Sequence, residues 1–177
     1  RLRPAIGASG SELGRGDRND RNGPSVAGSL QRLEIDPVRI TVVGDERTER
    51  AEALRLGLQE DLLVVSGGLG PTHDDRTIEL LAQAAGRTIA VDEGLAGEIE
   101  AFSRRIAERL KRPYADFADG VRKQAALPAG AKWVGLVGTA PAVVLDTGSC
   151  IAVALPGPPR ELQELWPRVL ETAPLRG

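Results

Sequence analysis

Aromatic residues, cysteine and histidine are all scarce in this chain. Its 177 residues include two Trp, one Tyr, two Phe, one Cys and one His. The single cysteine, Cys150, cannot form an intramolecular disulfide, and one Cys with one His cannot supply a zinc-binding set. The core is therefore expected to consist of Ala, Val, Leu and Ile. We interpret Cys150 as a small core residue and His73 as a structural or ligand-contacting residue, because no nucleophile motif accompanies it.

Long hydrophobic runs and a strong net charge are also missing. No apolar stretch approaches the roughly 20 residues of a membrane-spanning helix, and the first ten residues lack the apolar core of a secretory signal. The 23 basic and 25 acidic residues nearly balance, which gives no general attraction for nucleic acid. These absences favour a cytoplasmic protein that binds neither membranes nor nucleic acid. Residues 104–123 are locally basic, and such a stretch is more often a solvated face than an anion-binding one.

Glycine and proline, by contrast, are abundant. The 21 Gly and 12 Pro make up about 19% of the chain, against roughly 12% in average proteins. An apolar fraction of 41% and a net charge of −2 argue against disorder. A chain of about 150 residues buries roughly 70% of the surface that its unfolded form exposes. Residues 1–177 are therefore expected to form a single packed domain.

Short apolar runs alternate with amphipathic stretches along the chain. The runs predict strands at 3–8, 37–43, 61–66, 142–146 and 150–155, with a hairpin between the last two. Apolar residues at helical spacing predict helices that begin near residues 24, 48, 77, 92 and 160. Asp92 is expected to cap the fourth of these helices. This order predicts an α/β fold with a mostly parallel sheet covered on both faces, in which the hairpin adds antiparallel strands. Residues 92–126, where Pro and Asp interrupt the helical pattern, are expected to form a smaller lobe.

The strongest candidate site is the segment SGGLGPTHDDRT, Ser66–Thr77, between a predicted strand and a predicted helix. Its glycines are Gly67, Gly68 and Gly70. Such glycines let backbone N–H groups approach a phosphate closely, and the helix that follows adds the positive end of its dipole. The segment is not a Walker loop, because no Gly-Lys-Ser/Thr follows. It is not a dinucleotide fingerprint either, because His73 stands where the third Gly would be.

Two adjacent carboxylates, Asp74 and Asp75, follow these glycines. They repel each other unless one caps the helix and the other meets water, a cation or a basic side chain. A phosphate-bearing ligand usually brings Mg²⁺, which such carboxylates can hold with waters in the remaining positions. Asp45, at the end of another predicted strand, is placed similarly. A plain strand-to-helix turn capped by an aspartate fits these positions equally well.

Further loops follow the other predicted strands. The loop GSELGRGDRNDRN is too elaborate for a simple connection. Its Glu12, Asp20 and Asn22 could contact hydroxyl or amide groups of a ligand, or merely stabilise turns and cap the next helix. Residues 138–141 and 156–160 are Gly- and Pro-containing motifs at the ends of later strands.

Together these motifs resemble one known family. The stretches GSELGRGDRNDRN, VVGDE, SGGLGPTHDDRT, VRKQAALPAG, VGTAP and LPGPPREL occur in the order and spacing of the molybdenum-cofactor biosynthesis (MoCF, molybdopterin-binding) domain. They are most similar to its branch at the amino end of the competence-damage-inducible CinA proteins, from about Gly10 to Trp166. The resemblance implies a three-layer α/β fold in which these loops form one pocket for an anionic ligand.

The resemblance implies two alternative activities. Molybdopterin-binding relatives hold the pterin and its phosphate, whereas CinA-like relatives hydrolyse ADP-ribose to AMP and ribose 5-phosphate with a divalent metal such as Mg²⁺. This chain is then either a metal-dependent ADP-ribose pyrophosphatase or nucleotidyltransferase-like enzyme, or a non-catalytic module that binds molybdopterin or a nucleotide. The family also forms dimers or trimers, which implies a homo-oligomer. The deamidase domain of many CinA proteins has no counterpart in this sequence, so deamidase activity is not expected.

The same resemblance assigns roles to individual residues. Asp45 and Asp75 are implied to hold the metal and act in catalysis, with Asp74 in support. The implied ligand-binding residues are Ser11, Glu12, Asp20, Asn22, Ser66, Gly67, Gly68, Gly70, Pro71, Thr72, Thr77, Lys123, Gly138 and Thr139. Val121 and Ala142 stand where the family usually has Asn and Gly, a difference expected to reshape the pocket.

Overall fold

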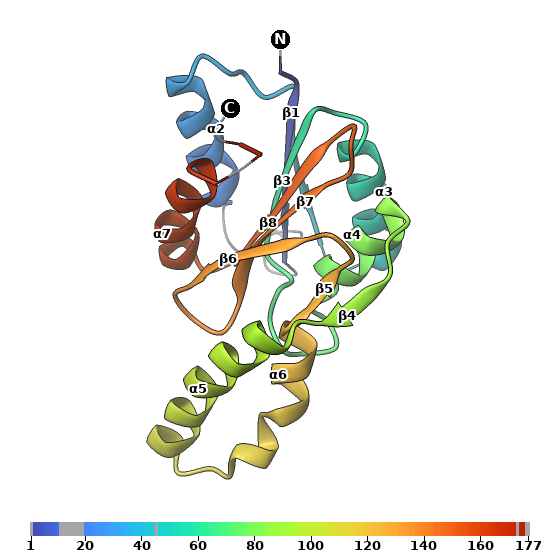
Figure 1. Cartoon of the computed structure of the whole chain (residues 1–177). Helices are drawn as coiled ribbons and strands as arrows, with labels where there is room; N and C mark the ends of the chain where they lie inside the picture. The colour runs from blue at the N-terminus through green and yellow to red at the C-terminus, as the bar shows by residue number, and fades with distance from the viewer. Residues whose placement is uncertain (1, 11–19, 45, 173, 176–177) are drawn as a thin grey trace.

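A computed structural model describes residues 2–10, 20–44, 46–172 and 174–175. Its main sheet has six strands in the order β2-β1-β3-β8-β7-β6 (Figure 1). These strands are β1 (Pro4–Ser9), β2 (Arg39–Val43), β3 (Leu62–Ser66), β6 (Lys132–Leu136), β7 (Pro141–Asp146) and β8 (Ile151–Leu155). The strands β2, β1, β3 and β8 pair in parallel, while β7 pairs antiparallel with both β8 and β6. The sheet is thus mixed and mostly parallel, which confirms the predicted fold class.

The central strand β3 explains why helices cover both faces of the sheet. All five of its residues are buried. Leu63 and Val65 belong to one core cluster, whereas Leu62 and Val64 belong to the other, because successive side chains of a strand point to opposite faces. The first cluster includes residues of α3 (Arg47–Gly57) and α4 (Thr77–Ala85), and the second includes residues of α2 (Asn22–Arg32) and α7 (Pro159–Leu170). Figure 1 shows the resulting three layers.

The segment of chain between the two strands of a second sheet forms a smaller lobe. This antiparallel sheet pairs β4 (Ile89–Val91) with β5 (Ala126–Pro128), and the lobe contains α5 (Glu93–Leu110), the short 3₁₀ helix η1 (Tyr114–Asp116) and α6 (Ala118–Gln124). The helices α5 and α6 project from the main body (Figure 1). Asp92 caps α5, since its carboxylate accepts a hydrogen bond of 2.9 Å from the Leu95 N–H. Both the lobe and this cap agree with the sequence prediction.

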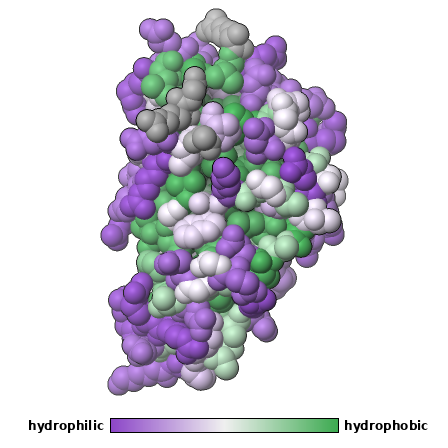
Figure 2. Space-filling model, in the orientation of Figure 1, coloured by the Kyte–Doolittle hydropathy of each residue, from purple (hydrophilic) through white to green (hydrophobic). Residues whose placement is uncertain are grey.

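Basic residues of the lobe have acidic and aromatic partners close by. Arg104 pairs with Glu100 at 2.7 Å and lies over the Tyr114 ring, and Arg112 pairs with Asp116 at 3.2 Å. Hydrophilic side chains dominate this end of the molecule in Figure 2. The basic stretch is therefore largely a solvated face, and each exposed ion pair contributes little to stability.

The remaining elements differ from the prediction for identifiable reasons. The strands β4 and β5 have only three residues each, which is too short for a visible alternation. In β6, Gly135 has a positive φ of 61° and the ladder is irregular. The helix α2 begins at Asn22 rather than at Pro24, because the Asp20 carboxylate accepts hydrogen bonds from the first N–H groups. Among the described helices, none combines the length and apolarity needed to span a bilayer.

Cys150 offers a test of this packing. Its side chain is 2% exposed, and burial raises the pKa of its thiol to about 11. The nucleophilic thiolate is therefore scarce in the folded protein near pH 8, whereas a free thiol has a pKa of about 8.5. We expect iodoacetamide to leave Cys150 unmodified under native conditions and to alkylate it in denaturant, as measured by mass spectrometry. Equal rates in both conditions would contradict the buried position.

Candidate functional site

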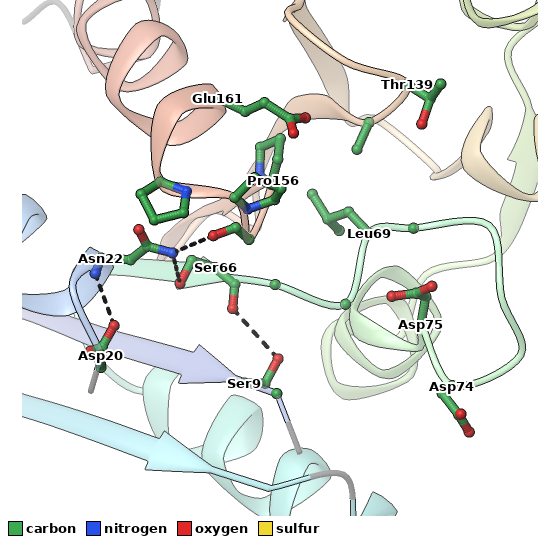
Figure 3. A pocket seen from close by; sticks show the side chains of 18 of the residues that line it. Ser9, Asp20, Asn22, Ser66, Leu69, Asp74, Asp75, Thr139, Pro156 and Glu161 are labelled. Carbon is green, nitrogen blue, oxygen red and sulfur yellow. Dashed lines mark hydrogen bonds between the residues drawn. The ribbon is translucent and has the colours of Figure 1, made fainter. Parts of the chain in front are cut away.

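A pocket of about 1010 Å³ opens at the carboxyl ends of the parallel strands (Figure 3). Its walls come from the loops that follow β1, β3, β6 and β8. Parallel strands end at the same edge of a sheet, so loops far apart in the sequence meet there. The volume is at the upper end of the range of about 300–1,000 Å³ for ligand pockets. The structure therefore places the Gly-rich segment in a ligand-sized pocket, hereafter the main pocket.

The Gly-rich loop leaves β3 through two residues in the left-handed region. Gly67 has φ of 92° and Gly68 has φ of 71°, a conformation that costs other residues energy. A Cβ atom would meet the carbonyl oxygen of Ser9 at the first position and the Thr77 hydroxyl at the second. Thr77 in turn donates from its hydroxyl to the Gly67 carbonyl at 2.7 Å and from its N–H to the Gly68 carbonyl at 3.2 Å. Glycine is thus required at both positions, and the buried Thr77 secures the loop.

A second set of hydrogen bonds holds the acidic end of this loop. Thr72 donates to one Asp75 oxygen twice, from its N–H at 3.0 Å and from its hydroxyl at 2.7 Å. The neighbouring Asp74 is exposed, and its carboxylate lies 3.4 Å from His73 Nε2. Both aspartates line the main pocket. The Thr72 contacts fix the Asp75 carboxylate relative to the loop.

Two polar residues, Asp20 and Asn22, form hydrogen bonds at the start of α2. Asp20 accepts hydrogen bonds from the N–H groups of Asn22 at 2.9 Å and Gly23 at 3.1 Å, so it caps α2. Asn22 donates from its side-chain nitrogen to the Gly157 carbonyl at 2.8 Å and to the Ser66 hydroxyl at 3.4 Å (Figure 3). The buried Asn22 therefore links the loops that follow β1, β3 and β8.

Gln124 plays the corresponding role on the side of the lobe. From the end of α6 it donates to the Leu69 carbonyl at 3.2 Å and to the Thr139 hydroxyl at 3.0 Å. These bonds connect the Gly-rich loop to the loop between β6 and β7. Gln124 does not stand out in the sequence, because its partners are 55 and 15 residues away.

Arg50 is a second lining residue that no sequence motif indicated. It is 5% exposed and donates to the Gly44 carbonyl at 3.0 Å and to the Asp74 carbonyl at 2.8 Å. The guanidinium therefore holds the backbone at Asp74 in place. One sequence signal was available, since Arg50 shares a helix face with the core residue Leu54 at i, i+4 spacing.

Lys123 lines a smaller cavity of about 230 Å³ next to the main pocket. The two cavities share Gly68, Leu69, Gly70, Asp75 and Gln124. Within the described residues the Lys123 ammonium nitrogen is buried without a hydrogen-bond partner. Burial lowers the pKa of Lys123, and the nearby carboxylates Asp75 and Glu79 act in the opposite direction.

The predicted site residues fall into three groups. Those that line the main pocket are Asp20, Asn22, Ser66, Gly67, Gly68, Gly70, Asp74, Asp75 and Thr139. Of the rest, Thr72 and Thr77 secure the Gly-rich loop, Lys123 lines the smaller cavity, Pro71 lies against Gly120 of α6, and Gly138 lies against the Glu161 carboxylate. Ser11, Glu12 and Asp45 lie outside the described residues.

The described residues do not form a ready-made metal site. No group of three or more His, Cys, Asp or Glu side chains in this part of the chain is arranged to hold a metal ion. One oxygen of Asp75 already accepts two hydrogen bonds from Thr72. Mg²⁺ commonly keeps several waters and binds through one or two carboxylates plus substrate phosphates. Asp74 and Asp75 suit an ion that enters in this way with the substrate.

This three-layer α/β fold is shared with known proteins. A family model described as "Probable molybdopterin binding domain" matches residues 5–175. CinA-like proteins of Mycobacterium tuberculosis (strain ATCC 25177 / H37Ra) and Mycobacterium sp. (strain MCS) are 38% and 42% identical over 180 residues, which cover 98% of this chain. The chain spans 42% of the length of these relatives. It belongs to the MoCF family, as its motifs predicted.

Solved structures agree with this assignment. The CinA protein of Thermoplasma acidophilum, described as having unknown function, matches with a TM-score of 0.82 and 29% identity over 96% of both chains. The molybdopterin biosynthesis enzyme MoaB of Thermus thermophilus matches with a TM-score of 0.61 over 98% of this chain and 92% of its own. Its identity is 21%, so it supports the fold alone.

The left-handed turn gives the first prediction from the site. We expect Gly68→Ala to lower the free energy of unfolding by at least about 1 kcal/mol, because of the positive φ and the contact with Thr77. Gly97→Ala is the matched control. Gly97 is exposed on α5, and a Cβ atom added there would have nothing within 4 Å, so this change should stabilise the protein by up to about 1 kcal/mol. Urea denaturation measures both, and equal effects would contradict the strained turn.

Lys123 gives the second prediction. A buried ammonium without a hydrogen-bond partner costs desolvation energy, so replacing it with an apolar side chain of similar length removes that cost. We expect Lys123→Met to raise the melting temperature of the free protein, by scanning calorimetry. Lys111→Met, at an exposed position in the lobe, is the control and should leave it nearly unchanged. A lower melting temperature for Lys123→Met would show that the Asp75 and Glu79 attraction outweighs desolvation.

Proposed function

We propose that this chain binds a phosphate-bearing nucleotide in the main pocket and hydrolyses ADP-ribose to AMP and ribose 5-phosphate. The observation that carries the proposal is the Gly67–Gly68 turn, secured by Thr77 beside Asp75 at the wall of a ligand-sized pocket. Membership of the MoCF family and the similarity to CinA-like proteins support it.

Backbone groups supply a reason to expect a phosphate. The helices α4 and α7 begin beside this pocket, at Thr77 and Pro159, whereas the first N–H groups of α2 already donate to Asp20. The amino end of a helix carries a partial positive charge and N–H groups without helical partners, which favour anions. The Gly-rich loop leads directly into α4, so the phosphates are placed there in this proposal.

The charged side chains of the pocket specify the ligand further. The described ionisable residues of the main pocket are Asp20, Asp74, Asp75, Glu161, Arg21 and Arg50. Four carboxylates against two guanidinium groups would repel a bare polyphosphate. The proposed substrate is therefore a nucleotide diphosphate that arrives with a divalent cation. When bound, that cation would neutralise phosphate charge and polarise the phosphoanhydride.

The protein's own residues hold and orient the substrate in this proposal. Asp75, fixed by Thr72, faces the substrate phosphates together with Asp74, whose backbone is held by Arg50. Asp45 joins them as a carboxylate of the same site. Further ligand contacts are assigned to Ser11, Glu12, Thr139 and the buried Lys123.

A binding module without catalytic activity is the second candidate. The family description as a probable molybdopterin binding domain favours it. In that case the same loop would hold a pterin phosphate or a nucleotide without cleaving it.

The hydrolase is tested by AMP release. With ADP-ribose and Mg²⁺, Mn²⁺ or Co²⁺, we expect AMP to accumulate and Asp75→Asn to slow it at least about a hundredfold, because a catalytic carboxylate is lost. Asp119→Asn is the matched control. It changes an exposed aspartate in the lobe and should leave the rate unchanged.

The outcomes separate the two candidates. AMP release no faster than that of Asp75→Asn with any of the three metals would rule out the hydrolase. Calorimetric titration with AMP or molybdopterin then measures binding. Saturable binding without turnover would establish that the chain is a binding module without catalytic activity.

A further inference from the structure

A carboxylate that no sequence motif assigned lines the main pocket. Glu161 lies in the first turn of α7, half-buried, and its side chain extends beside Pro156 (Figure 3). No residue in the described part of the chain donates a hydrogen bond to it. Burial raises the pKa of Glu161, and the neighbouring Arg160 opposes that rise. A partly desolvated carboxylate without a donor is costly unless a ligand supplies one.

The sequence around Glu161 explains why its carboxylate is available. A glutamate at the third position of a helix often turns back to accept a hydrogen bond from the N–H of the capping residue. Here the capping residue is Pro158, and the first helical residue is Pro159. Proline has no N–H, so this self-capping contact is impossible. The carboxylate is left for other partners.

Gly138, in the loop between β6 and β7, leaves room for this carboxylate. A Cβ atom at Gly138 would lie 2.6 Å from Glu161 Oε1 and 3.0 Å from its carboxyl carbon. Glycine at this position therefore accommodates the carboxyl group in its observed place. This contact gives Gly138 a role that does not require it to touch the ligand.

Glu161 also enters the pocket from a different side than Asp74 and Asp75. It belongs to α7, which packs on the same face of the sheet as α2, whereas Asp74 and Asp75 precede α4 on the other face. An ionised carboxylate cannot donate a hydrogen bond to a phosphate, but it can accept hydrogen bonds from hydroxyl or amino groups. We propose that Glu161 accepts hydrogen bonds from O–H or N–H donors of the ligand. The assignment rests on the proposed function, because it needs a ligand whose phosphates lie on the Gly-rich loop.

Isothermal titration tests this role with three probes on the full 177-residue chain. AMP carries ribose hydroxyls and a ring amino group, ribose 5-phosphate carries hydroxyls alone, and inorganic pyrophosphate carries neither. We expect Glu161→Gln to weaken AMP binding about tenfold, since a hydrogen bond to a charged acceptor becomes a weaker one to a neutral amide oxygen. Pyrophosphate binding should be unchanged or tighter, because a nearby negative charge is removed. Glu164→Gln, at an exposed position three residues further along α7, should change neither.

A second variant and a stability measurement distinguish a lost ligand contact from misfolding of the variant. Glu161→Asp keeps the charge but withdraws the carboxylate, and it should weaken AMP binding while leaving pyrophosphate binding unchanged. An equal loss for ribose 5-phosphate and AMP assigns the contact to the hydroxyls, whereas a loss for AMP alone assigns it to the ring amino group. Melting temperatures of the variants should match that of the unmodified chain.

The possible failures are distinguishable. AMP affinity that is unchanged in both Glu161 variants would overturn the role of Glu161 and leave the proposed function standing. Losses of the same size for AMP and pyrophosphate would also overturn it, because they would indicate a disturbed pocket rather than a lost donor contact. If none of the probes binds the unmodified chain, the proposed nucleotide site itself is wrong.

Discussion

The turn at the end of β3 is the constraint on which the candidate site depends. The chain leaves the buried strand through Gly67 and Gly68, and Thr77 bonds back to both of their carbonyls at the start of α4. This closes the loop over ten residues and sets where Asp74 and Asp75 stand. Neighbouring segments then pack against it. A Cβ at Gly157 would come within 3.3 Å of the Gly67 Cα, so the loop after β8 approaches the same turn closely.

Neutral side chains hold the pocket together, while several charged ones remain at its wall. Asn22 joins the loops after β1, β3 and β8, and Gln124 joins the Gly-rich loop to the loop between β6 and β7. An amide can satisfy carbonyl and hydroxyl partners without bringing a charge into a partly buried place. The carboxylates of Asp75 and Glu161 consequently keep oxygens with no donor among the described residues. The charged Asp20 and Arg50 also hold backbone groups, so the wall combines residues that position the loops with carboxylates that can bind a ligand.

Sequence alone predicted the features that depend on local order. Apolar runs located the four parallel strands, Asp92 was identified as a helix cap, and the Gly-rich segment fell where β3 ends. The features that it missed depend on contacts across the fold. Gln124 acts on Leu69, which is 55 residues away, and Glu161 is available only because its helix begins with two prolines. Motif order therefore indicated which loops meet, but not which side chains hold them together.

The two cavities offer different binding groups, and one ligand can engage both. Carboxylates outnumber guanidinium groups at the described wall of the main pocket, so this wall favours a cation or hydrogen-bond donors. The smaller cavity, which shares Gly68 and Gly70, adds the Lys123 ammonium, which lacks a hydrogen-bond partner in the described structure and lies near Asp75 and Glu79. A bare phosphate would satisfy only the ammonium, and a bare metal ion only the carboxylates. A phosphate that carries a divalent cation supplies both charges at once, and its binding would relieve unfavourable interactions already present in the free protein.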